Sequence, residues 1–319
     1  MMMKALVRDR YGLQDLRVEE IEKPAVEDDQ VLVRVRASSI NKADWYGLVG
    51  EPRLFRPMMG GIFKPKGRQV GTDFAGVVEA VGNGVEGYTV GDEVFGGRDG
   101  AYAEYVSAKF FARKPAGVTF EQAGTIGIAG LTALQALRDH AGVREGERVL
   151  VNGASGGVGT MTVQIAKALG AHVTAVCSTH NVEQARALGA DRVIDYTDED
   201  FTRTGDRYDV VIDVAGSRPW RALRRVLAPG ARVVVVGAPG GTPLIGPLAH
   251  IIGMKLASHG RAKFFVAKFN SPDLQALADM MASGKLTPVV DRTYELVEAP
   301  EALKRFGEGH VRGKLVLTI

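Results

Sequence analysis

Between residues 147 and 238, near-continuous apolar segments alternate with amphipathic ones, and this alternation restricts the fold more than any other feature of the chain. The apolar segments lie at 147–154, 171–178, 191–196, 208–216 and 231–238. Amphipathic segments with helical spacing separate them at 157–170, 181–189 and 218–230, the last closed by Gly230. Strands that are apolar throughout are buried on both faces, and a helix after a strand returns the chain to a parallel neighbour. The pattern predicts an α/β domain with a doubly wound parallel sheet.

The remainder of the chain has a different pattern. The first third is rich in Val, Gly and turns, and "QVLVRVRASSI" (30–40) alternates apolar and polar residues as a half-buried strand does. Near the end, a helix capped by Ser271 and a strand at 313–319 are predicted. We expect a mostly antiparallel β domain formed by residues 1–115 and 270–319, interrupted by the parallel-sheet domain at 116–269.

Composition excludes several classes of protein. The 40 basic and 37 acidic residues are dispersed along the chain, so nucleic-acid binding is not expected. No run approaches 18 apolar residues, and the first residues contain no apolar signal segment, so we expect no membrane association. The single cysteine, Cys177, excludes an intramolecular disulfide and is typical of a reducing compartment, which predicts a cytoplasmic protein.

A glycine-rich loop joins the first parallel strand to its helix. In "NGASGGVGT", Ala154, Gly156 and Gly159 occupy the three positions of the G-x-G-x-x-G fingerprint, with Ala in place of the first Gly. The middle glycine lets a pyrophosphate approach the backbone closely, and the last glycine lets the helix pack closely against the strand. The N-terminus of the helix attracts the phosphates. The loop predicts a Rossmann-type dinucleotide site, although glycines in such turns can serve the turn alone.

The end of the second parallel strand bears on which dinucleotide binds. An NAD site usually places Asp or Glu there for the ribose 2′-OH, whereas this chain has "CSTHN" (177–181) and no acid. Ser178, His180 and Asn181 can all donate to a 2′-phosphate, so NADPH is the expected cofactor. Alternatively, Ser178 and Asn181 cap the following helix, and both roles are compatible.

Seven motifs in order along the chain resemble a known family. They are "INKADWYGLVGEP", "GTDFAGVVEAVGNGV", "VGDEVFG", "AGLTALQAL", "NGASGGVGTMTVQIAKALGA", "LGADRVIDY" and "GHVRGKLVLTI". With them the chain resembles the medium-chain dehydrogenase/reductases, in the zinc-independent quinone oxidoreductase branch. The resemblance implies a GroES-like β domain beside the nucleotide domain. It also implies a homodimer that pairs an edge strand within "KFFVAKF" (263–269).

Zinc-dependent members of that superfamily differ at the metal ligands. They carry a His-Glu pair where this chain has Thr72 and Asp73, and a Cys in the segment that is "SINKAD" here. A catalytic zinc takes about three protein ligands. The sequence offers at most Asp73 at these positions, so no metal is expected.

The resemblance also implies the site. Asn41 would hold the nicotinamide ribose or the substrate carbonyl, Tyr46 would donate to that carbonyl or relay a proton, and Asp44 would orient its neighbours. Alternatively, Tyr46 packs in the core, Asp44 caps a turn, and solvent supplies the proton. The cofactor-binding residues implied are Asn41, Thr132, Ala154, Ser155, Gly156, Gly157, Val158, Gly159, Ser178, His180, Asn181, Tyr196, Gly237, Ala238, Phe265, Val266 and Lys314.

Several of these residues have a second interpretation. Thr132 is either a nicotinamide contact or a helix threonine bonded to its own backbone. Phe265 and Val266 either close the cleft or belong to a dimer strand, and Lys314 either reaches the cofactor or is a solvated charge. The basic, apolar loop at 53–69 is expected to border the substrate through Phe55, Met58, Met59 and Phe63, or to pack on its own domain.

Without a Lewis acid, hydride delivery to an already polarised acceptor is easier than alcohol oxidation. The sequence therefore favours an NADPH-dependent, zinc-independent reductase of quinones or α,β-unsaturated carbonyls, with a small-molecule substrate. A zinc-free alcohol dehydrogenase or carbonyl reductase is the second interpretation. An NADPH-binding structural or interaction protein with little turnover is the third.

Overall fold

The computed structural model describes residues 1–319 except 60, 238–247 and 310, and it does not describe the side chains of Phe55, Met58, Met59 and Leu248. The described chain forms two compact units. Unit 1 comprises residues 1–131, 268–284 and 288–319, and unit 2 comprises residues 132–267 and 285–287. The predicted domain ranges, 1–115 with 270–319 and 116–269, stay a prediction. None of the described helices is long and apolar enough to cross a membrane.

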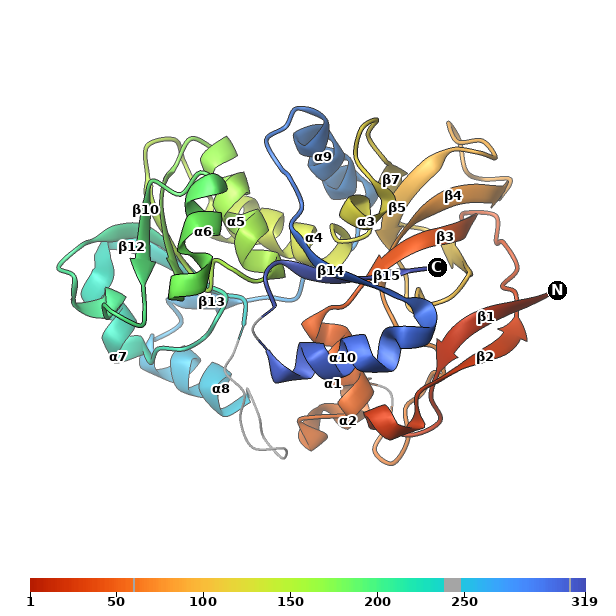
Figure 1. The fold of residues 1–319 in the computed structure, drawn as a ribbon. Helices are drawn as coiled ribbons and strands as arrows, with labels where there is room; N and C mark the ends of the chain where they lie inside the picture. Colours follow the sequence, from red (N-terminus) through yellow and green to blue (C-terminus); the bar gives the residue numbers. More distant parts are fainter. Residues whose placement is uncertain (60, 238–247, 310) are drawn as a thin grey trace. The chain divides into compact units, whose positions relative to one another are not determined.

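Unit 1 is built on a mostly antiparallel sheet. Its strands follow the order β14 (Val290–Glu295), β15 (Lys314–Thr318), β3 (Val31–Ser39), β4 (Asp73–Val81), β5 (Glu93–Gly97) and β7 (Phe111–Arg113), and β6 (Tyr105–Ala108) also pairs with β3. Only β14 and β15 run parallel. A hairpin of β1 (Met2–Val7) and β2 (Arg17–Glu22) completes the strands. In Figure 1, β15 from the end of the chain lies beside β3 from its start.

The helices of unit 1 are mostly short. They are α1 (Lys42–Val49), α2 (Arg56–Met59), α3 (Phe120–Ala123), α9 (Ser271–Ala282) and α10 (Ala299–Glu308). Helix α4 (Gly127–Gln135) begins in unit 1 and ends in unit 2. The N-cap of α9 is Asn270 and not Ser271 as predicted, because the Asn270 amide oxygen accepts the Asp273 N–H at 2.8 Å. Pro272 still lies in the first turn, where no N–H is needed.

Unit 2 contains the predicted parallel sheet. Its order is β10 (Arg192–Asp195), β9 (His172–Cys177), β8 (Arg148–Asn152), β11 (Tyr208–Asp213), β12 (Leu227–Val235) and β13 (Ala262–Phe264). Every pairing is parallel, and the order reverses direction between β8 and β11. The helices are α5 (Gly157–Ala168), α6 (Val182–Ala187), α7 (Trp220–Leu223) and α8 (Leu248–Ala257), with a π-helix at Ala136–Ala141. The predicted fold class, a Rossmann-type parallel sheet plus a GroES-like β domain, is confirmed.

One predicted helix is much shorter than its sequence pattern. The segment 218–230 forms only the four residues of α7 and a 3-10 turn before β12 begins at Leu227. Leu227 already pairs with Tyr208 of β11, so sheet pairing overrides the helical spacing there. Trp220, Leu223 and Val226 are buried, which produces the periodicity that predicted a longer helix.

Candidate functional site

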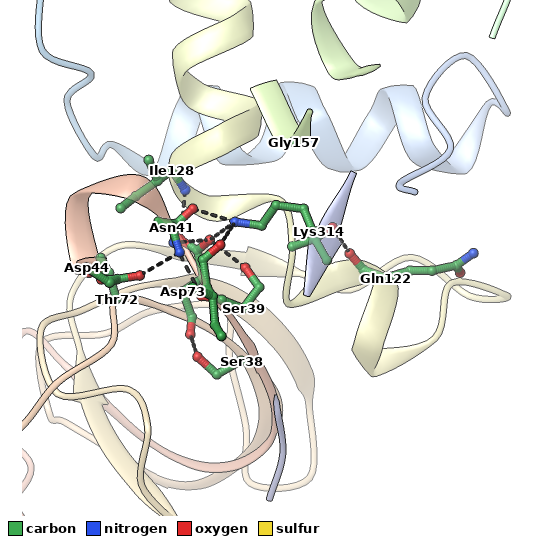
Figure 2. A network of polar contacts seen from close by, with 12 residues as sticks. Ser38, Ser39, Asn41, Asp44, Thr72, Asp73, Gln122, Ile128, Gly157 and Lys314 are labelled. Carbon is green, nitrogen blue, oxygen red and sulfur yellow. Dashed lines mark hydrogen bonds and ion pairs between the residues drawn. The ribbon is translucent and has the colours of Figure 1, made fainter. Parts of the chain in front are cut away.

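A buried polar cluster in unit 1 contains two of the three predicted catalytic residues, Asn41 and Asp44. It collects side chains from the end of β3, the start of α1, the start of β4 and the start of β15, as Figure 2 shows. We call it the Asp73 cluster, and its members are Ser38, Ser39, Asn41, Asp44, Thr72, Asp73, Tyr102 and Lys314. Tyr46, the third predicted residue, lies two residues after Asp44 in α1 and is partly buried.

Asp73 is completely buried at the centre of the cluster. Its Oδ2 accepts Ser39 Oγ and Asn41 Nδ2, each at 2.9 Å. Its Oδ1 accepts the backbone N–H of Ile128 at 2.7 Å, in the first turn of α4, where the helix dipole favours a carboxylate. The approach is close enough that a Cβ on Gly127 would lie 2.2 Å from Oδ1. A glycine is therefore required where α4 meets this carboxylate.

Lys314 supplies the positive charge of the cluster. Its ammonium donates to Ile40 O at 2.8 Å and to Asn41 Oδ1, and lies 3.7 Å from Asp73 Oδ2. Lys314 is only 4% exposed, so the interpretation as a solvated charge is wrong. Burial lowers the pKa of its ammonium, and the Asp73 carboxylate opposes that shift. The predicted contact of Lys314 with the cofactor stays a prediction.

Asp44 is the most perturbed acid of the cluster. Burial raises its pKa to about 6, while the hydrogen bond from Thr72 Oγ1 at 2.6 Å acts in the opposite direction. Tyr102 OH donates to Asp44 at 3.1 Å, and the Asn41 N–H donates to it at 3.0 Å. Sequence reasoning missed Tyr102, which lies 58 residues from Asp44 and has no motif around it. Burial also raises the pKa of the Tyr46 phenol, which therefore remains protonated at neutral pH.

The glycine loop of unit 2 has the geometry that the fingerprint requires. Gly156 is the N-cap of α5, and no described atom lies within 4 Å of the position a Cβ would take on it. A Cβ on Gly159, in contrast, would lie 2.0 Å from the carbonyl oxygen of Gly153. Gly153 and Ala154 both donate their N–H to Val176 O, which fixes the loop to β9. Ser155, Gly157 and Val158 complete the loop and are partly exposed. The loop can accept a pyrophosphate at Gly156 and packs tightly at Gly159.

The loop after β9 carries the predicted selectivity residues. Ser178 and Asn181 stand at the N-cap positions of a 3-10 turn and of α6, but neither side chain accepts a backbone N–H there, so the predicted side-chain capping is wrong. Instead, Asn181 Nδ2 donates to Ser178 Oγ at 2.9 Å. Asn181 Oδ1 has no partner among the described residues, and His180 is exposed. Tyr196 is 52% exposed directly after β10, and its N–H donates to Cys177 O.

The structure also brings an acid to this loop that the sequence pattern did not reveal. Asp195 at the end of β10 pairs in register with Cys177 at the end of β9. Asp195 and Ser178 therefore lie at the same, carboxyl-terminal end of the parallel strands. A hydrogen bond from Thr179, with further bonds from Thr197, lowers the pKa of Asp195. The carboxylate is therefore ionised and already has local donors.

A second buried polar pair lies where the sheet order reverses. Asn152 ends β8, and its Nδ2 donates to Asp213 Oδ1 at 2.7 Å at the end of β11. Asp213 Oδ1 also accepts the Gly216 N–H, but Oδ2 has no partner in the described part of the chain. Burial raises the pKa of Asp213 to about 6. Gly237 lies against the same turn, since its Cβ would be 1.9 Å from Val214 O. Ala238 lies outside the described residues.

The remaining predicted residues belong to other segments of the chain. Thr132 is buried in α4. Phe265 stacks on His140 with ring centroids 4.1 Å apart, and Val266 is 87% exposed beyond the end of β13. In the 53–69 loop, Phe63 is exposed, and Tyr11 OH donates to Gly61 O, so the loop contacts its own unit. Its other predicted wall residues, Phe55, Met58 and Met59, have side chains that the structure does not describe.

Cys177 has the properties of a core residue. It is buried, and burial raises the pKa of its thiol to about 11, so the thiol is protonated at neutral pH. We expect Cys177→Ala to leave NADPH oxidation within about twofold of wild type, as measured by absorbance at a saturating acceptor concentration. A loss of most of the activity would show that the sulfur takes part in the chemistry.

Comparison with known proteins assigns the family. The model of the alcohol dehydrogenase GroES-like domain matches residues 27–115, and that of the zinc-binding dehydrogenases matches residues 188–317. The chain is 33% identical to the chloroplastic quinone-oxidoreductase QR1 of Triphysaria versicolor, over 99% of this chain and 98% of the relative. It is 32% identical to a 2-methylene-furan-3-one reductase of Solanum lycopersicum, over 99% of this chain and 79% of the relative. The structure of the quinone oxidoreductase from Coxiella burnetii superposes with a TM-score of 0.85 at 32% identity, covering all of both chains.

These matches extend over both units and agree with the seven sequence motifs. Among the described residues, no group of three or more His, Cys, Asp and Glu side chains could hold a metal ion. The chain belongs to the medium-chain dehydrogenase/reductase superfamily, in its quinone oxidoreductase-like branch, and is an NAD(P)H-dependent oxidoreductase.

Proposed function

We propose that the protein is an NADPH-dependent reductase that delivers hydride to quinones or α,β-unsaturated carbonyls without a catalytic zinc. Relatives named for quinone and enone reduction, matched along nearly the whole chain, support this acceptor class. The observation that carries the proposal is that the carboxylate of Asp73 is already bound by neighbouring side chains and backbone. Its carboxylate accepts Ser39, Asn41 and Ile128 and pairs with Lys314, and no group of three metal-binding side chains surrounds it among the described residues. The residues present do not fit a catalytic zinc.

The residues present do fit a dinucleotide. The open space at Gly156 and the N-terminus of α5 can hold a pyrophosphate, and the loop at 178–181 can hold the adenosine ribose. A bound nicotinamide cofactor supplies the hydride. Of the chain's own residues, Tyr46 is the proposed proton donor, Asp44 orients its neighbours, and Asn41 holds the start of α1. The remaining proposed cofactor contacts are Thr132, Tyr196, Gly237, Ala238, Phe265 and Val266.

A panel of acceptors tests this function against its alternatives. NADPH loss is followed by absorbance with 1,4-benzoquinone, with an enal and with a simple ketone. Turnover of the quinone or the enal supports the proposal. Turnover of the ketone alone contradicts it and favours a carbonyl reductase. NADPH binding with no turnover of any acceptor also contradicts it and favours a binding protein.

The proposed preference for NADPH rests on the hydrogen-bond donors of the 178–181 loop. The negative charge of Asp195 acts against this preference, because it would repel a 2′-phosphate. We expect Ser178→Asp to lower the affinity for NADPH relative to NADH by at least about tenfold, because it adds a carboxylate beside the 2′-phosphate. Ser178→Asn is the matched control, because asparagine has nearly the same shape as aspartate but carries no charge. Fluorescence titration measures both affinities. A wild type that prefers NADH would contradict the assignment.

We also propose a homodimer formed through β13. This strand ends the sheet of unit 2, and exposed apolar side chains lie near it at Ile252, Leu256 and Val266. We expect light scattering to give about twice the 34.1 kDa of one chain. Val266→Asp should shift the mass toward the monomer, whereas Val297→Asp, at an exposed position of unit 1, should not. A monomeric wild type would contradict the proposal.

The single free cysteine supports a reducing compartment, and we propose the cytoplasm.

A further inference from the structure

The Asp73 cluster leaves the Asn41 amide one orientation. A lysine ammonium can only donate, so it must face the amide oxygen, and an ionised carboxylate can only accept, so it must face the amide nitrogen. Both contacts are present, from Lys314 to Asn41 Oδ1 and from Asn41 Nδ2 to Asp73 Oδ2 (Figure 2). A 180° rotation of the amide would break both contacts at once. The ion pair therefore acts on Asn41 as a fixed two-point clamp.

The same carboxylate also determines where two helices begin. Asn41 is the N-cap of α1, and Asp73 binds its side chain. Ile128 lies in the first turn of α4, and Asp73 accepts its N–H. The Lys314 ammonium binds the backbone just before α1 as well, through Ile40 O. One ion pair thus joins the starts of α1 and α4.

A buried ion pair is weak evidence that the arrangement serves stability. A buried ion pair loses the hydration of both charges, and replacing both partners by neutral residues is often tolerated, whereas removing one partner is not. Lys314 also has its donors occupied within unit 1 by Ile40, Asn41 and Asp73. These contacts suit a residue that acts on its neighbours within the unit.

We propose that Lys314 and Asp73 are positioning residues that clamp Asn41 and so hold the start of α1, the helix that carries the proposed catalytic residues Asp44 and Tyr46. This inference rests on the proposed function for its effect on turnover, but the clamp itself can be measured without any acceptor. It departs from the expectation that Lys314 binds the cofactor. It predicts that loss of the pair impairs kcat and the order of α1, and leaves the affinity for NADPH unchanged.

The test uses the single variants Lys314→Met and Asp73→Asn, the double variant D73N/K314M, and Lys304→Met as a control at an exposed position of unit 1. We expect Lys314→Met to lower Tm strongly, because it leaves a buried carboxylate without its cation. The double variant should recover most of that loss, so it provides a folded protein without the clamp. Lys304→Met should match the wild type in every measurement.

Two readouts on the double variant decide the outcome. Hydrogen exchange in a peptide covering residues 39–50 should be at least tenfold faster than in the wild type, with α9 unchanged. The kcat for the best acceptor should fall at least tenfold, with the Kd for NADPH within twofold. Unchanged hydrogen exchange in residues 39–50 of the double variant overturns the clamp. This readout needs no acceptor, so it remains decisive if the wild type reduces none and the proposed function fails. Recovery of full kcat together with Tm overturns the positioning role, as does a tenfold weaker Kd with kcat unchanged.

Discussion

Gly159→Ala should destabilise the protein by about 3 kcal/mol and abolish measurable NADPH binding. The new Cβ would lie 2.0 Å from Gly153 O and 2.8 Å from Ala154 Cα. Both atoms belong to residues whose backbone N–H groups donate to Val176 O of β9, so neither residue can move without disrupting the loop. The helix would have to shift away from the strand, and its N-terminus would leave the position proposed for the pyrophosphate.

Gly156→Ala is the matched comparison in the same loop. Its φ of −83° suits any residue, and no described atom lies within 4 Å of the new Cβ, so the free energy of unfolding should change by less than about 1 kcal/mol. The affinity for NADPH should still fall at least about tenfold, because the methyl group occupies the space of the pyrophosphate. Urea unfolding and fluorescence titration measure the two effects. Equal destabilisation by both variants would contradict the separate roles of the two glycines.

Asp213→Asn should make the protein more stable at pH 8 than the wild type, by up to about 3 kcal/mol, and leave it nearly unchanged at pH 4. In the folded chain burial raises the pKa of this carboxyl from 3.8 to about 6. A raised acid pKa means that the folded state binds the proton more tightly than the unfolded state. Stability from this group is therefore complete below pH 3.8 and is lost as the pH rises to about 6.

The amide keeps the structural contacts and removes the titration. Its oxygen can accept Asn152 Nδ2 and the Gly216 N–H as the carboxyl does now. Urea unfolding between pH 4 and pH 8 should show a shallower decline in the variant, and part of the decline should remain because Asp44 has a similarly raised pKa. Asp198→Asn, at an exposed position of the same unit, is the control and should match the wild type. A variant less stable than the wild type at pH 8 would show that the ionised form is the one the fold requires.

The sequence predicted the features that depend on local pattern. The parallel strands and the loop at 154–159 follow from periodicity and glycine spacing, and both are present. The helix at 218–230 was overpredicted, because its apolar spacing could not reveal that Leu227 pairs with Tyr208. The cap at Asn270 differs by one residue from the predicted Ser271, since both types of side chain cap well.

The features that were missed depend on register between distant segments. Asp195 reaches the 178–181 loop only because β10 pairs with β9 so that it lies opposite Cys177. Lys314 meets Asn41 across 273 residues of sequence, because β15 inserts between β14 and β3. No spacing rule within one segment encodes these contacts. Asn41 and Asp44 were found through a motif, whereas the partners that hold them required the sheet.

The place of β15 in its sheet has a consequence for the order of synthesis. As the chain leaves the ribosome, residues 1–131 of unit 1 emerge first, followed by nearly all of unit 2 as one continuous segment. Throughout that time Asp73 lacks the ammonium of Lys314, and the end of β3 at residues 37–39 lacks its partner β15. Unit 2 can therefore complete its folding before unit 1, although unit 1 begins first. The first segment of unit 1 is therefore completed only after the segment that carries Lys314 has been translated.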